Sequence, residues 1–237
     1  MISIGVLGAS GRLGKEIVRL LESEFAQDAK ITAAPQRGEK LDSLLNCDAV
    51  IDFSSPEAVV ALAQTAEHHR GRMPALVAGS TGWKLDTKKE LEKMSLQTPI
   101  LMSSNFSIGV LILTDILKKA SPLLDKLGYQ PVIVDIHHKH KKDAPSGTAL
   151  SLQRAIAPAG PGNVQTHSVR QGEVIGDHEI TFYGTADHLT FGHFAQDRSI
   201  FARGAIQCAL WLATSRVSLT GFVGIESYFE YLKDQLK

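Results

Sequence analysis

The sequence predicts an α/β protein in two parts: an N-terminal domain built on a parallel sheet, and an α+β domain with a mixed sheet. Over about the first 107 residues, short apolar runs alternate with segments of helical periodicity, as in parallel sheets with right-handed crossovers. After about residue 108 the rhythm changes, and three strand-like stretches follow one another without long helices. The 237 residues are 43% hydrophobic and 21% charged, which is enough for a packed core in two small domains.

The N-terminal part begins with a strand at residues 2–7, a glycine-rich turn at 8–14 and a helix of apolar 3.6-residue period. Ser55 and Pro56 are suited to start a second helix, whose apolar positions run through residues 58–66. Further strands are expected at residues 30–34, 49–53, 75–78 and 100–102.

The second part begins with a helix from about residue 108, on which Leu113, Ile116 and Leu117 form one apolar stripe. A strand at 132–136 leads into a polar segment at 137–149. The remaining elements are expected to be a helix ending near residue 157, a loop at 158–162, strands at 165–170, 178–183 and 189–194, a helix at 199–214, and a last amphipathic helix carrying Ile225, Phe229, Leu232 and Leu236.

Composition excludes several classes of protein. Lys plus Arg and Asp plus Glu number 25 each, so a chain-wide cationic surface for nucleic acid or an anionic membrane is not expected. The only two cysteines, Cys47 and Cys208, are too few and too far apart for a disulfide framework or a zinc site. The apolar runs fall short of the ~18 residues that span a bilayer, and no leader pattern is visible. We expect a soluble protein of the reducing cytoplasm.

The first turn carries Gly8, Gly11 and Gly14, directly after a strand and at the start of a helix. Glycines at these places permit a tight turn, close approach of a pyrophosphate, and close packing of helix on sheet. The helix N-terminus offers N–H groups to phosphates, and Arg12 could add a full charge. The spacing is GxxGxxG, with Ser10 where the common fingerprint has its middle glycine. The pattern favours a Rossmann-like dinucleotide site; the alternative is a glycine-rich turn that binds no nucleotide.

The end of the second strand bears on cofactor choice. A carboxylate for the ribose hydroxyls is usual there in NAD sites, but this chain has Gln36 and Arg37. Neither repels a 2′-phosphate, and Arg37 could hold one, so NADPH should be at least accepted. The alternative is that Arg37 is a solvated loop charge.

Residues 137–142, HHKHKK, crowd three imidazoles and three ammonium groups at the end of a strand. Like charges lower one another's pKa, which would make a lysine here a better proton donor. A metal site is disfavoured because the run contains no acid and three lysines, and a nucleic-acid patch because aromatic residues are lacking. A solvated basic loop also remains open.

The residues that follow favour a site for a small polyanion. After a turn at residues 143–145, Ser146, Gly147 and Thr148 open a helix whose N–H groups suit a carboxylate. If the preceding strand keeps its alternation, Asp135 and His137 share a face, and the carboxylate could orient that imidazole.

Five motifs stand out along the chain: GASGRLG from Gly8, DFSSPEA from Asp52, GSTGW from Gly79, SSNFSIGV from Ser103 and HHKHKKDAPSGTAL from His137. Together they resemble the 4-hydroxy-tetrahydrodipicolinate reductase family of bacterial and plant lysine biosynthesis, and the resemblance extends to FARGAIQCALWL at 201–212. It implies a dinucleotide-binding domain at 1–107 and 199–237, and an inserted substrate-binding and oligomerisation domain at 108–198. It also implies a homotetramer.

The resemblance also implies roles for individual residues. The catalytic pair falls on His137 and Lys141, and Ser10, Gln36 and the Ser103–Ser104 pair depart from residues common in the family. These departures bear on the choice between NADH and NADPH. The substrate-binding residues fall on His138, Ser146, Gly147 and Thr148, and the cofactor-binding residues on Gly8, Ala9, Ser10, Gly11, Arg12, Leu13, Arg37, Gly79, Ser80, Thr81, Ser103, Ser104, Asn105 and Phe106.

The expected reaction is therefore reduction of a cyclic dicarboxylate, 4-hydroxy-tetrahydrodipicolinate, to tetrahydrodipicolinate, with hydride from NADPH or NADH and no metal. Lys141 is the expected proton donor with His137 as partner or relay, although coupled groups can share a titration and the order stays open. Two alternatives remain: another reductase of small carboxylated imines or aldehydes, and a sensor that binds NAD(P) without turnover. His178, His193 and Arg198 are weaker candidates, and Trp83 and Trp211 are expected to be packing residues.

Overall fold

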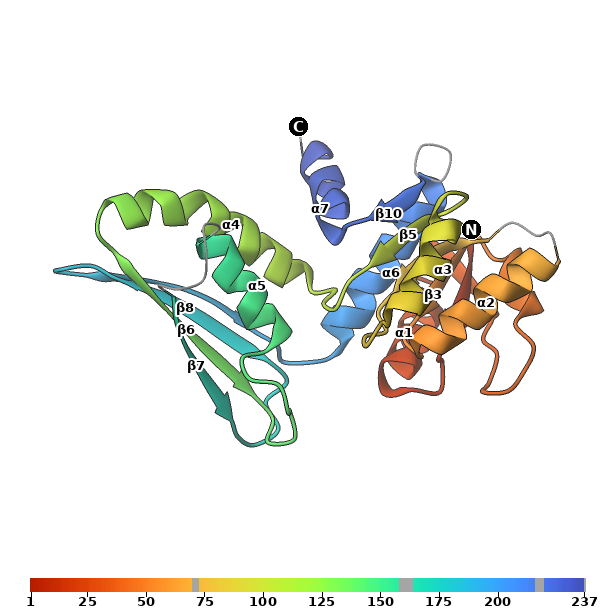
Figure 1. Cartoon of the computed structure of the whole chain (residues 1–237), viewed down its shortest axis with the longest axis horizontal. Coiled ribbons are helices and arrows are strands. Elements are labelled where there is room, and N and C mark those ends of the chain that lie inside the picture. The colour runs from red at the N-terminus through yellow and green to blue at the C-terminus, as the bar shows by residue number, and fades with distance from the viewer. Residues whose placement is uncertain (70–72, 158–163, 216–219, 237) are drawn as a thin grey trace. The chain divides into compact units, whose positions relative to one another are not determined.

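The chain folds into two compact units, seen in a computed structural model that describes residues 1–69, 73–157, 164–215 and 220–236 (Figure 1). Unit 1 comprises Met1–Phe106 and Ser199–Lys237, and unit 2 comprises Ser107–Arg198. The domain boundaries expected from the sequence, 107/108 and 198/199, differ from these by one residue at the first boundary. The predicted fold class is confirmed, because unit 1 has a parallel sheet with helices and unit 2 a separate mixed sheet.

Unit 1 is built on a six-stranded sheet in which every neighbouring pair is parallel. The strand order is β10-β5-β4-β3-β1-β2, so the chain first moves outward from β1 to β2 and then returns to build the sheet on the other side. In such sheets ligands bind at the carboxyl ends of the strands, near the place where the direction reverses. The strands are β1 (Ile2–Leu7), β2 (Ala29–Ala33), β3 (Ala49–Asp52), β4 (Ala75–Ala78), β5 (Pro99–Met102) and β10 (Gly221–Val223).

Helices cover both faces of this sheet. α1 and α6 pack side by side on one face, and α2 and α3 pack side by side on the other (Figure 1). A short 3₁₀ helix, η1, lies between β2 and β3, and α7 packs against α6. The helices are α1 (Arg12–Glu22), η1 (Asp42–Asn46), α2 (Pro56–His68), α3 (Leu85–Ser95), α6 (Ser199–Thr214) and α7 (Ile225–Asp234).

Local sequence signals account for α2. The hydroxyl of Ser55 accepts a hydrogen bond from Ala58 N–H at 3.3 Å, and Pro56 occupies the first turn, where its missing N–H costs nothing. The predicted helix start is confirmed. The predicted apolar positions from residue 58 onward include the residues that face the core, namely Val59, Leu62, Ala63 and Ala66.

Three expectations about the helices were incomplete or wrong. α3 was not predicted, because most of its residues are charged and only Leu91 and Met94 are buried apolar residues. Ile116 is 41% exposed, so it does not belong to the stripe that buries Leu113 and Leu117. Leu236 lies beyond the end of α7 and is 88% exposed; the buried residues of that helix are Ile225 and Tyr228.

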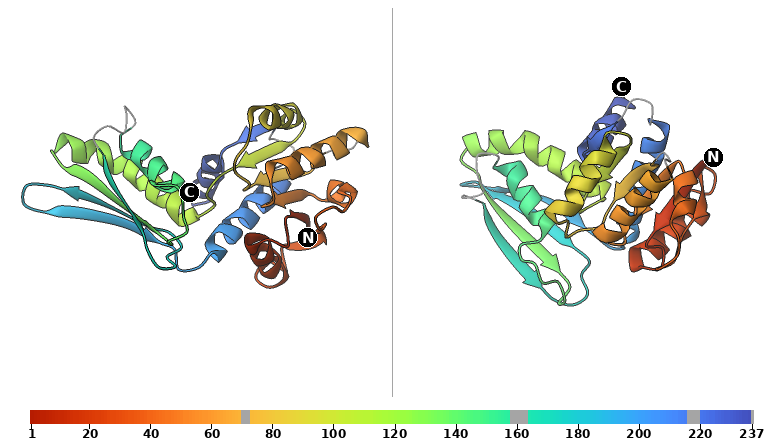
Figure 2. Two further views of the ribbon diagram at one scale, coloured as in Figure 1. Left: turned by 60° about the horizontal axis from the view of Figure 1, so that its bottom comes forward. Right: turned by 45° about the vertical axis from the view of Figure 1, so that its right-hand side comes forward.

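Unit 2 is a four-stranded mixed sheet covered on one face by two helices (Figure 2). β6 runs parallel to β7 and antiparallel to β8, which pairs with β9. Ile133, Ile180 and Phe182 face the helices and form the core with them. Because side chains alternate along a strand, Asp135 and His137 share this covered face with Ile133. The elements are α4 (Ile108–Lys126), β6 (Gln130–His137), α5 (Gly147–Ile156), β7 (Gln165–Arg170), β8 (Asp177–Tyr183) and β9 (His188–Phe194).

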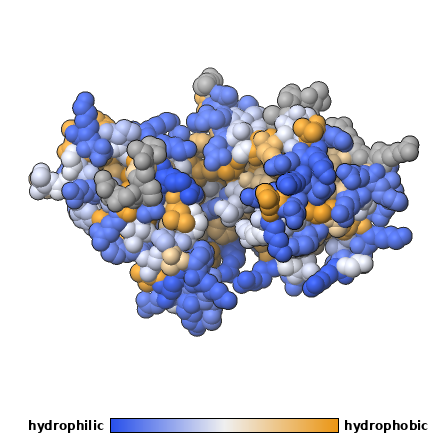
Figure 3. Space-filling view, in the orientation of Figure 1, coloured by the Kyte–Doolittle hydropathy of each residue, from blue (hydrophilic) through white to orange (hydrophobic). Residues whose placement is uncertain are grey.

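The three strands predicted at 165–170, 178–183 and 189–194 correspond to β7, β8 and β9. The predicted loop at 158–162 lies outside the described residues. Within the described part of the chain, no helix is both long and apolar enough to cross a membrane. On the face shown in Figure 3, hydrophilic residues cover much of the surface, with apolar residues in small groups among them.

Candidate active site

The turn between β1 and α1 depends on its glycines. Gly8 has a φ of +90°, and a Cβ there would lie 2.9 Å from the backbone of Phe53 and Ser54. A Cβ on Gly14 would collide with the carbonyl oxygen of Gly8, so α1 can lie this close to the turn only with glycine. Gly11 is the N-cap of α1, and no side chain caps the helix there. The first turn of α1 therefore suits an anion such as a pyrophosphate.

A pocket of about 590 Å³ opens beside this turn, between the carboxyl ends of β1, β2 and β3. Of the predicted cofactor-binding residues, Gly8, Ser10, Gly11 and Arg37 line it, whereas Ala9, Arg12, Leu13 and the two later turns do not. The full lining is Leu7, Gly8, Ser10, Gly11, Pro35, Gln36, Arg37, Gly38, Glu39, Leu41, Phe53, Ser54, Ser55, Ala58 and Ala61.

The other predicted cofactor turns follow β4 and β5, and thus lie along the same edge of the parallel sheet. Trp83 Nε1 donates to the carbonyl oxygen of Ser80 at 2.8 Å and pins the turn that carries Gly79, Ser80 and Thr81. The ring of Phe106 is buried and meets Phe53 edge to face at 5.7 Å, so only its backbone remains for a ligand. Ser103 holds its own turn, since its hydroxyl donates to Asn105 O at 2.6 Å.

Sequence reasoning missed an acid in the cofactor pocket. Glu39 lies three residues beyond Gln36 and accepts a hydrogen bond from Gln36 N–H at 2.8 Å. It lines the same pocket as Arg37, and both are exposed. The dinucleotide fingerprint has its acid at the strand end, whereas Glu39 lies beyond it and is brought back by the turn at Gly38.

A second missed residue, Asp52, is fully buried at the carboxyl end of β3. Its Oδ1 accepts a hydrogen bond from Ser54 N–H at 2.9 Å and another from the Ser54 hydroxyl. Burial raises the pKa of Asp52, and its polar neighbours Ser54 and Ser80 offset part of that rise. A buried carboxyl thus stands below the turns that would hold a cofactor.

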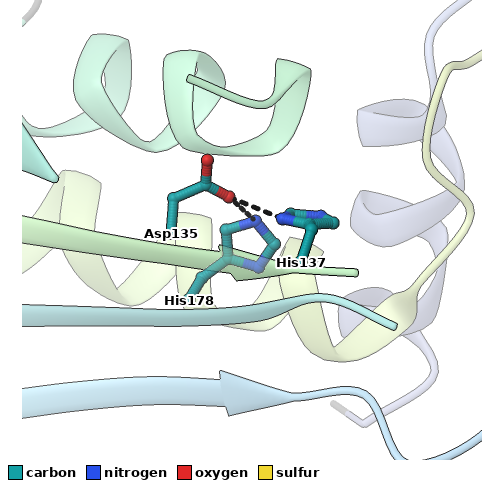
Figure 4. A group of neighbouring side chains, drawn as sticks. All are labelled: Asp135, His137 and His178. Atoms are coloured by element: carbon teal, nitrogen blue, oxygen red, sulfur yellow. Dashed lines mark ion pairs between the residues drawn. The ribbon is translucent and has the colours of Figure 1, made fainter. Parts of the chain in front are cut away.

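In unit 2, His137 and His178 both point at one oxygen of Asp135 (Figure 4). His137 Nδ1 lies 2.9 Å from Asp135 Oδ1, and His178 Nε2 lies 3.4 Å from the same atom. The rings meet edge to face, with centroids 5.2 Å apart, and all three side chains are buried. The prediction that Asp135 and His137 share a face is confirmed.

The second oxygen of Asp135 is also engaged. Oδ2 accepts hydrogen bonds from Ser146 N–H and from Arg170 Nη2, both at 2.9 Å. Burial alone would raise the pKa of Asp135, but the two imidazoles, the Ser146 N–H and Arg170 together hold it well below its usual range. Asp135 is therefore a permanent buried anion whose charge is compensated by its neighbours.

Asp135, His137 and His178 also have the composition of a metal site, since one candidate ligand atom from each lies within 4.8 Å of the others. Residues 137–142 contain no acid, but Asp135, two residues before them, supplies one. Arg170 already places a positive charge on this carboxylate and would repel a divalent ion. We interpret the cluster as a charge network around His137.

Lys141 has an anionic neighbour that the sequence argument did not consider. Its Nζ lies 2.9 Å from Asp143 Oδ1, and only 23% of its side chain is exposed. The ion pair holds the pKa of Asp143 below its usual range. Arg170 Nη2 donates to the carbonyl oxygen of Asp143 at 2.7 Å, so the loop that carries Lys141 is tied to Asp135 through Arg170.

The pKa of His138 is also shifted. Desolvation, together with the charges of Arg198 and His137, lowers the pKa of His138. Near neutral pH its imidazole is therefore uncharged, and it can donate one hydrogen bond to a carboxylate without adding a full charge.

Ser146 already has partners within the protein. Its hydroxyl caps α5 by accepting from Ala149 N–H at 3.1 Å, and it lies 3.2 Å from His178 Nε2. A Cβ on Gly147 would meet no atom within 4 Å, so nothing in the described chain requires glycine there. The open space at Gly147 would leave room for a ligand on the first turn of α5.

The weaker candidates have defined surroundings. His193 Nε2 lies 3.0 Å from the hydroxyl of Ser107, which fits a hydrogen-bonded structural histidine. Trp83 packs against the core of unit 1, and Trp211 packs against the tilted rings of Tyr228 and Tyr231, as expected for packing residues.

Comparison with known families decides the relationship. Residues 2–106 match the family model described as dihydrodipicolinate reductase, N-terminus, and residues 109–228 match the one described as dihydrodipicolinate reductase, C-terminus. This chain belongs to the dihydrodipicolinate reductase family. The predicted resemblance is confirmed.

Relatives in this family are similar over most of their length. The 4-hydroxy-tetrahydrodipicolinate reductase of Caulobacter vibrioides is 36% identical, covering 89% of this chain and 91% of that protein. The enzyme of the same name from Bdellovibrio bacteriovorus is 37% identical, covering 92% and 93%. The solved structure of dipicolinate-bound dihydrodipicolinate reductase from Paenisporosarcina sp. TG-14 superposes with a TM-score of 0.74 at 20% identity, covering 94% of this chain and 97% of that one, which shows a shared fold.

Arg170 is the residue of this family member that sequence reasoning missed most clearly. In the structure, the parallel register of β6 and β7 pairs Asp135 with Ser168 and His137 with Arg170. Alternation along the strand predicted at 165–170 puts Ser168 and Arg170 on one face, but the sequence alone does not show which strand lies beside it.

Proposed function

We propose that this chain is a 4-hydroxy-tetrahydrodipicolinate reductase of lysine (diaminopimelate) biosynthesis, using NADPH or NADH in the cytoplasm. The observation that supports it best lies in unit 2. There one oxygen of Asp135 contacts the His137 ring, and the other accepts a hydrogen bond from Ser146 N–H at the start of α5. A dinucleotide sensor has no use for a proton-handling group beside an anion-binding helix start. Both family models match, one on each part of the chain.

Unit 1 has the features that a dinucleotide requires. The uncapped start of α1 and the close packing at Gly8 and Gly14 leave room for a pyrophosphate, and the adjoining pocket suits the adenosine half. We assign to the pyrophosphate and the adenosine half the residues Gly8, Ala9, Ser10, Gly11, Arg12, Leu13 and Arg37. We assign to the remainder of the dinucleotide the residues of the two later turns, Gly79, Ser80, Thr81, Ser103, Ser104, Asn105 and Phe106. The bound cofactor would supply hydride from its nicotinamide.

Unit 2 would hold the cyclic dicarboxylate. Gly147 and Thr148, in the first turn of α5, would bind one carboxylate with backbone N–H groups, and His138 would donate a further hydrogen bond. We assign Ser146 a supporting part, because its hydroxyl already caps α5 and its N–H already donates a hydrogen bond to Asp135.

Reduction of a conjugated C=C–C=N system leaves negative charge that a proton must quench. Lys141 would supply that proton, and His137 would act as its partner or relay, with Asp135 stabilising the imidazolium form. Asp143 keeps Lys141 in place between turnovers.

The proposed homotetramer has a candidate surface. On the face of the unit 2 sheet turned away from α4 and α5, the register aligns Val169 with Ile136, and Phe194 lies two strands further across the same row. Val169 is 37% exposed and Phe194 56% exposed in the single chain, which supports contact with another copy. Light scattering during size-exclusion chromatography would test this, with Phe194→Asp expected to reduce the molecular mass of the assembly.

The function itself is tested by NADPH and NADH oxidation, with substrate generated in the cuvette from pyruvate and aspartate semialdehyde by the preceding synthase. Oxidation that requires the synthase would support the proposal. Folded protein that binds NADPH but oxidises neither cofactor would overturn it.

A further inference from the structure

We propose that Asp135 is a positioning residue which, with Arg170 and His178, holds the His137 ring, the Lys141 loop and the first turn of α5 in one arrangement. The inference rests on the proposed function, which assigns proton transfer and carboxylate binding to those three groups. In this inference Asp135, Arg170 and His178 touch none of the reacting atoms, but the reaction depends on them because they position the groups that do.

Asp135 is the point where four elements meet. It belongs to β6, and its side chain is fully buried on the face covered by α5. The groups that reach its two oxygens are His137 from the end of β6, His178 from β8, Ser168 and Arg170 from β7, and the Ser146 N–H at the start of α5.

Arg170 extends this arrangement to the Lys141 loop. Its Nη1 donates to the carbonyl oxygen of Asp135 at 3.1 Å, and Nη2 donates both to Asp135 Oδ2 and to the carbonyl oxygen of Asp143. Asp143 is in turn paired with Lys141. Loss of the Asp135 charge would release the guanidinium and, through it, the loop that presents the lysine.

His178 connects the network to the helix start. Its Nε2 lies between Asp135 Oδ1 at 3.4 Å and the hydroxyl of Ser146 at 3.2 Å. The ring also supports His137 edge on. The position of α5, and of the carboxylate it would bind, therefore depends on the same anion as the orientation of His137.

Space around His137 is limited on its other side. A Cβ on Gly176 would lie 3.0 Å from His137 Nε2, so the ring has little room to turn toward that loop. The ring is set between this backbone and the Asp135 carboxylate, and a positive charge on it is stabilised 2.9 Å away.

Asp135→Asn tests the proposal, because it keeps the shape and removes the charge. We expect kcat to fall about 10- to 100-fold, as for other residues that orient catalytic groups, with the Kd of NADPH unchanged by fluorescence titration. Histidine-selective NMR should show changed ring nitrogen resonances for His137, because its Nδ1 then faces a neutral amide in place of the carboxylate 2.9 Å away. Asp125→Asn, an exposed carboxylate of α4, is the matched control and should change none of these.

Asp135→Glu should restore part of kcat, because it returns the charge. If Asp135→Asn does not fold, Arg170→Lys replaces it: the positive charge stays but the links to Asp143 are lost, so kcat should fall with unchanged His137 ring resonances. Folded Asp135→Asn with wild-type kcat and unshifted His137 ring resonances would overturn the proposal. Failure of the wild-type protein to turn over substrate would instead overturn the proposed function, and the NMR spectra would still decide whether Asp135 holds the His137 ring.

Discussion

Replacing Asp52 by asparagine is expected to make the protein more stable at neutral pH. Asp52 is fully buried, and its Oδ2 has no aligned hydrogen-bond partner among the described residues. Asparagine keeps an oxygen for Ser54 and offers an N–H₂ group to the Ser80 hydroxyl, which is likewise unpartnered within the described chain. The substitution therefore removes a buried charge without removing its hydrogen-bonded neighbours.

The magnitude and its pH dependence follow from burial. A buried polar group left without a partner costs about 1 to 3 kcal/mol, so we expect a gain of about 1 to 2 kcal/mol at pH 7. Burial raises the pKa of Asp52 above its ordinary value of 3.8, with Ser54 and Ser80 opposing. A carboxyl whose pKa is raised by folding is protonated in both the folded and the unfolded state below pH 3.8, and there it costs no stability. The free energy of unfolding then decreases as the pH rises through the folded-state pKa. The gain should therefore be near zero below pH 3.8 and increase as the pH rises through the folded-state pKa of Asp52.

Thermal unfolding of wild type and Asp52→Asn at several pH values measures this directly, with about 2 to 4 °C expected per kcal/mol for a chain of this size. Asp48→Asn is the contrasting control. Asp48 is only half-buried, and its two charge-assisted hydrogen bonds from Ser3 would weaken with a neutral amide, so that substitution should not raise the melting temperature. A melting temperature of Asp52→Asn that is lower than wild type at pH 8, or a difference independent of pH, would refute the reasoning.

Three further predictions concern the reaction. Lys141→Ala should lower kcat by about 10² to 10⁴, the contribution of a positioned general acid, and a loss below tenfold in steady-state assays would remove Lys141 from that role. His138→Gln should mainly raise the KM for the dicarboxylate, and an unchanged KM would count against carboxylate binding by that imidazole. Glu39→Gln should tighten NADPH more than NADH in fluorescence titrations, because it removes a negative charge from the pocket that contains Arg37; equal changes for both cofactors would contradict this.

The parts of the fold that the sequence predicts are those set by local rules. The Gly8 turn follows from backbone sterics, and the start of α2 follows from the Ser55 cap and Pro56. The pairing of Asp135 with His137 follows from strand alternation within one element. Each of these needs only neighbouring residues.

The parts that escaped prediction depend on distant segments or on weak patterns. Arg170 and His178 reach Asp135 only because β7 and β8 both lie beside β6, which strand spacing does not reveal. Glu39 is brought to Gln36 by a turn with a positive φ at Gly38. α3 has too few apolar residues for its period to be visible.

In the proposed reaction, hydride passes from the cofactor to a cyclic dicarboxylate. The most direct test is turnover of synthase-generated substrate with NADPH that carries deuterium at both C4 positions, followed by mass spectrometry of the product. We predict tetrahydrodipicolinate containing one deuterium, with greatly reduced formation by Lys141→Ala. Cofactor oxidation that leaves no deuterium in the product would contradict the account.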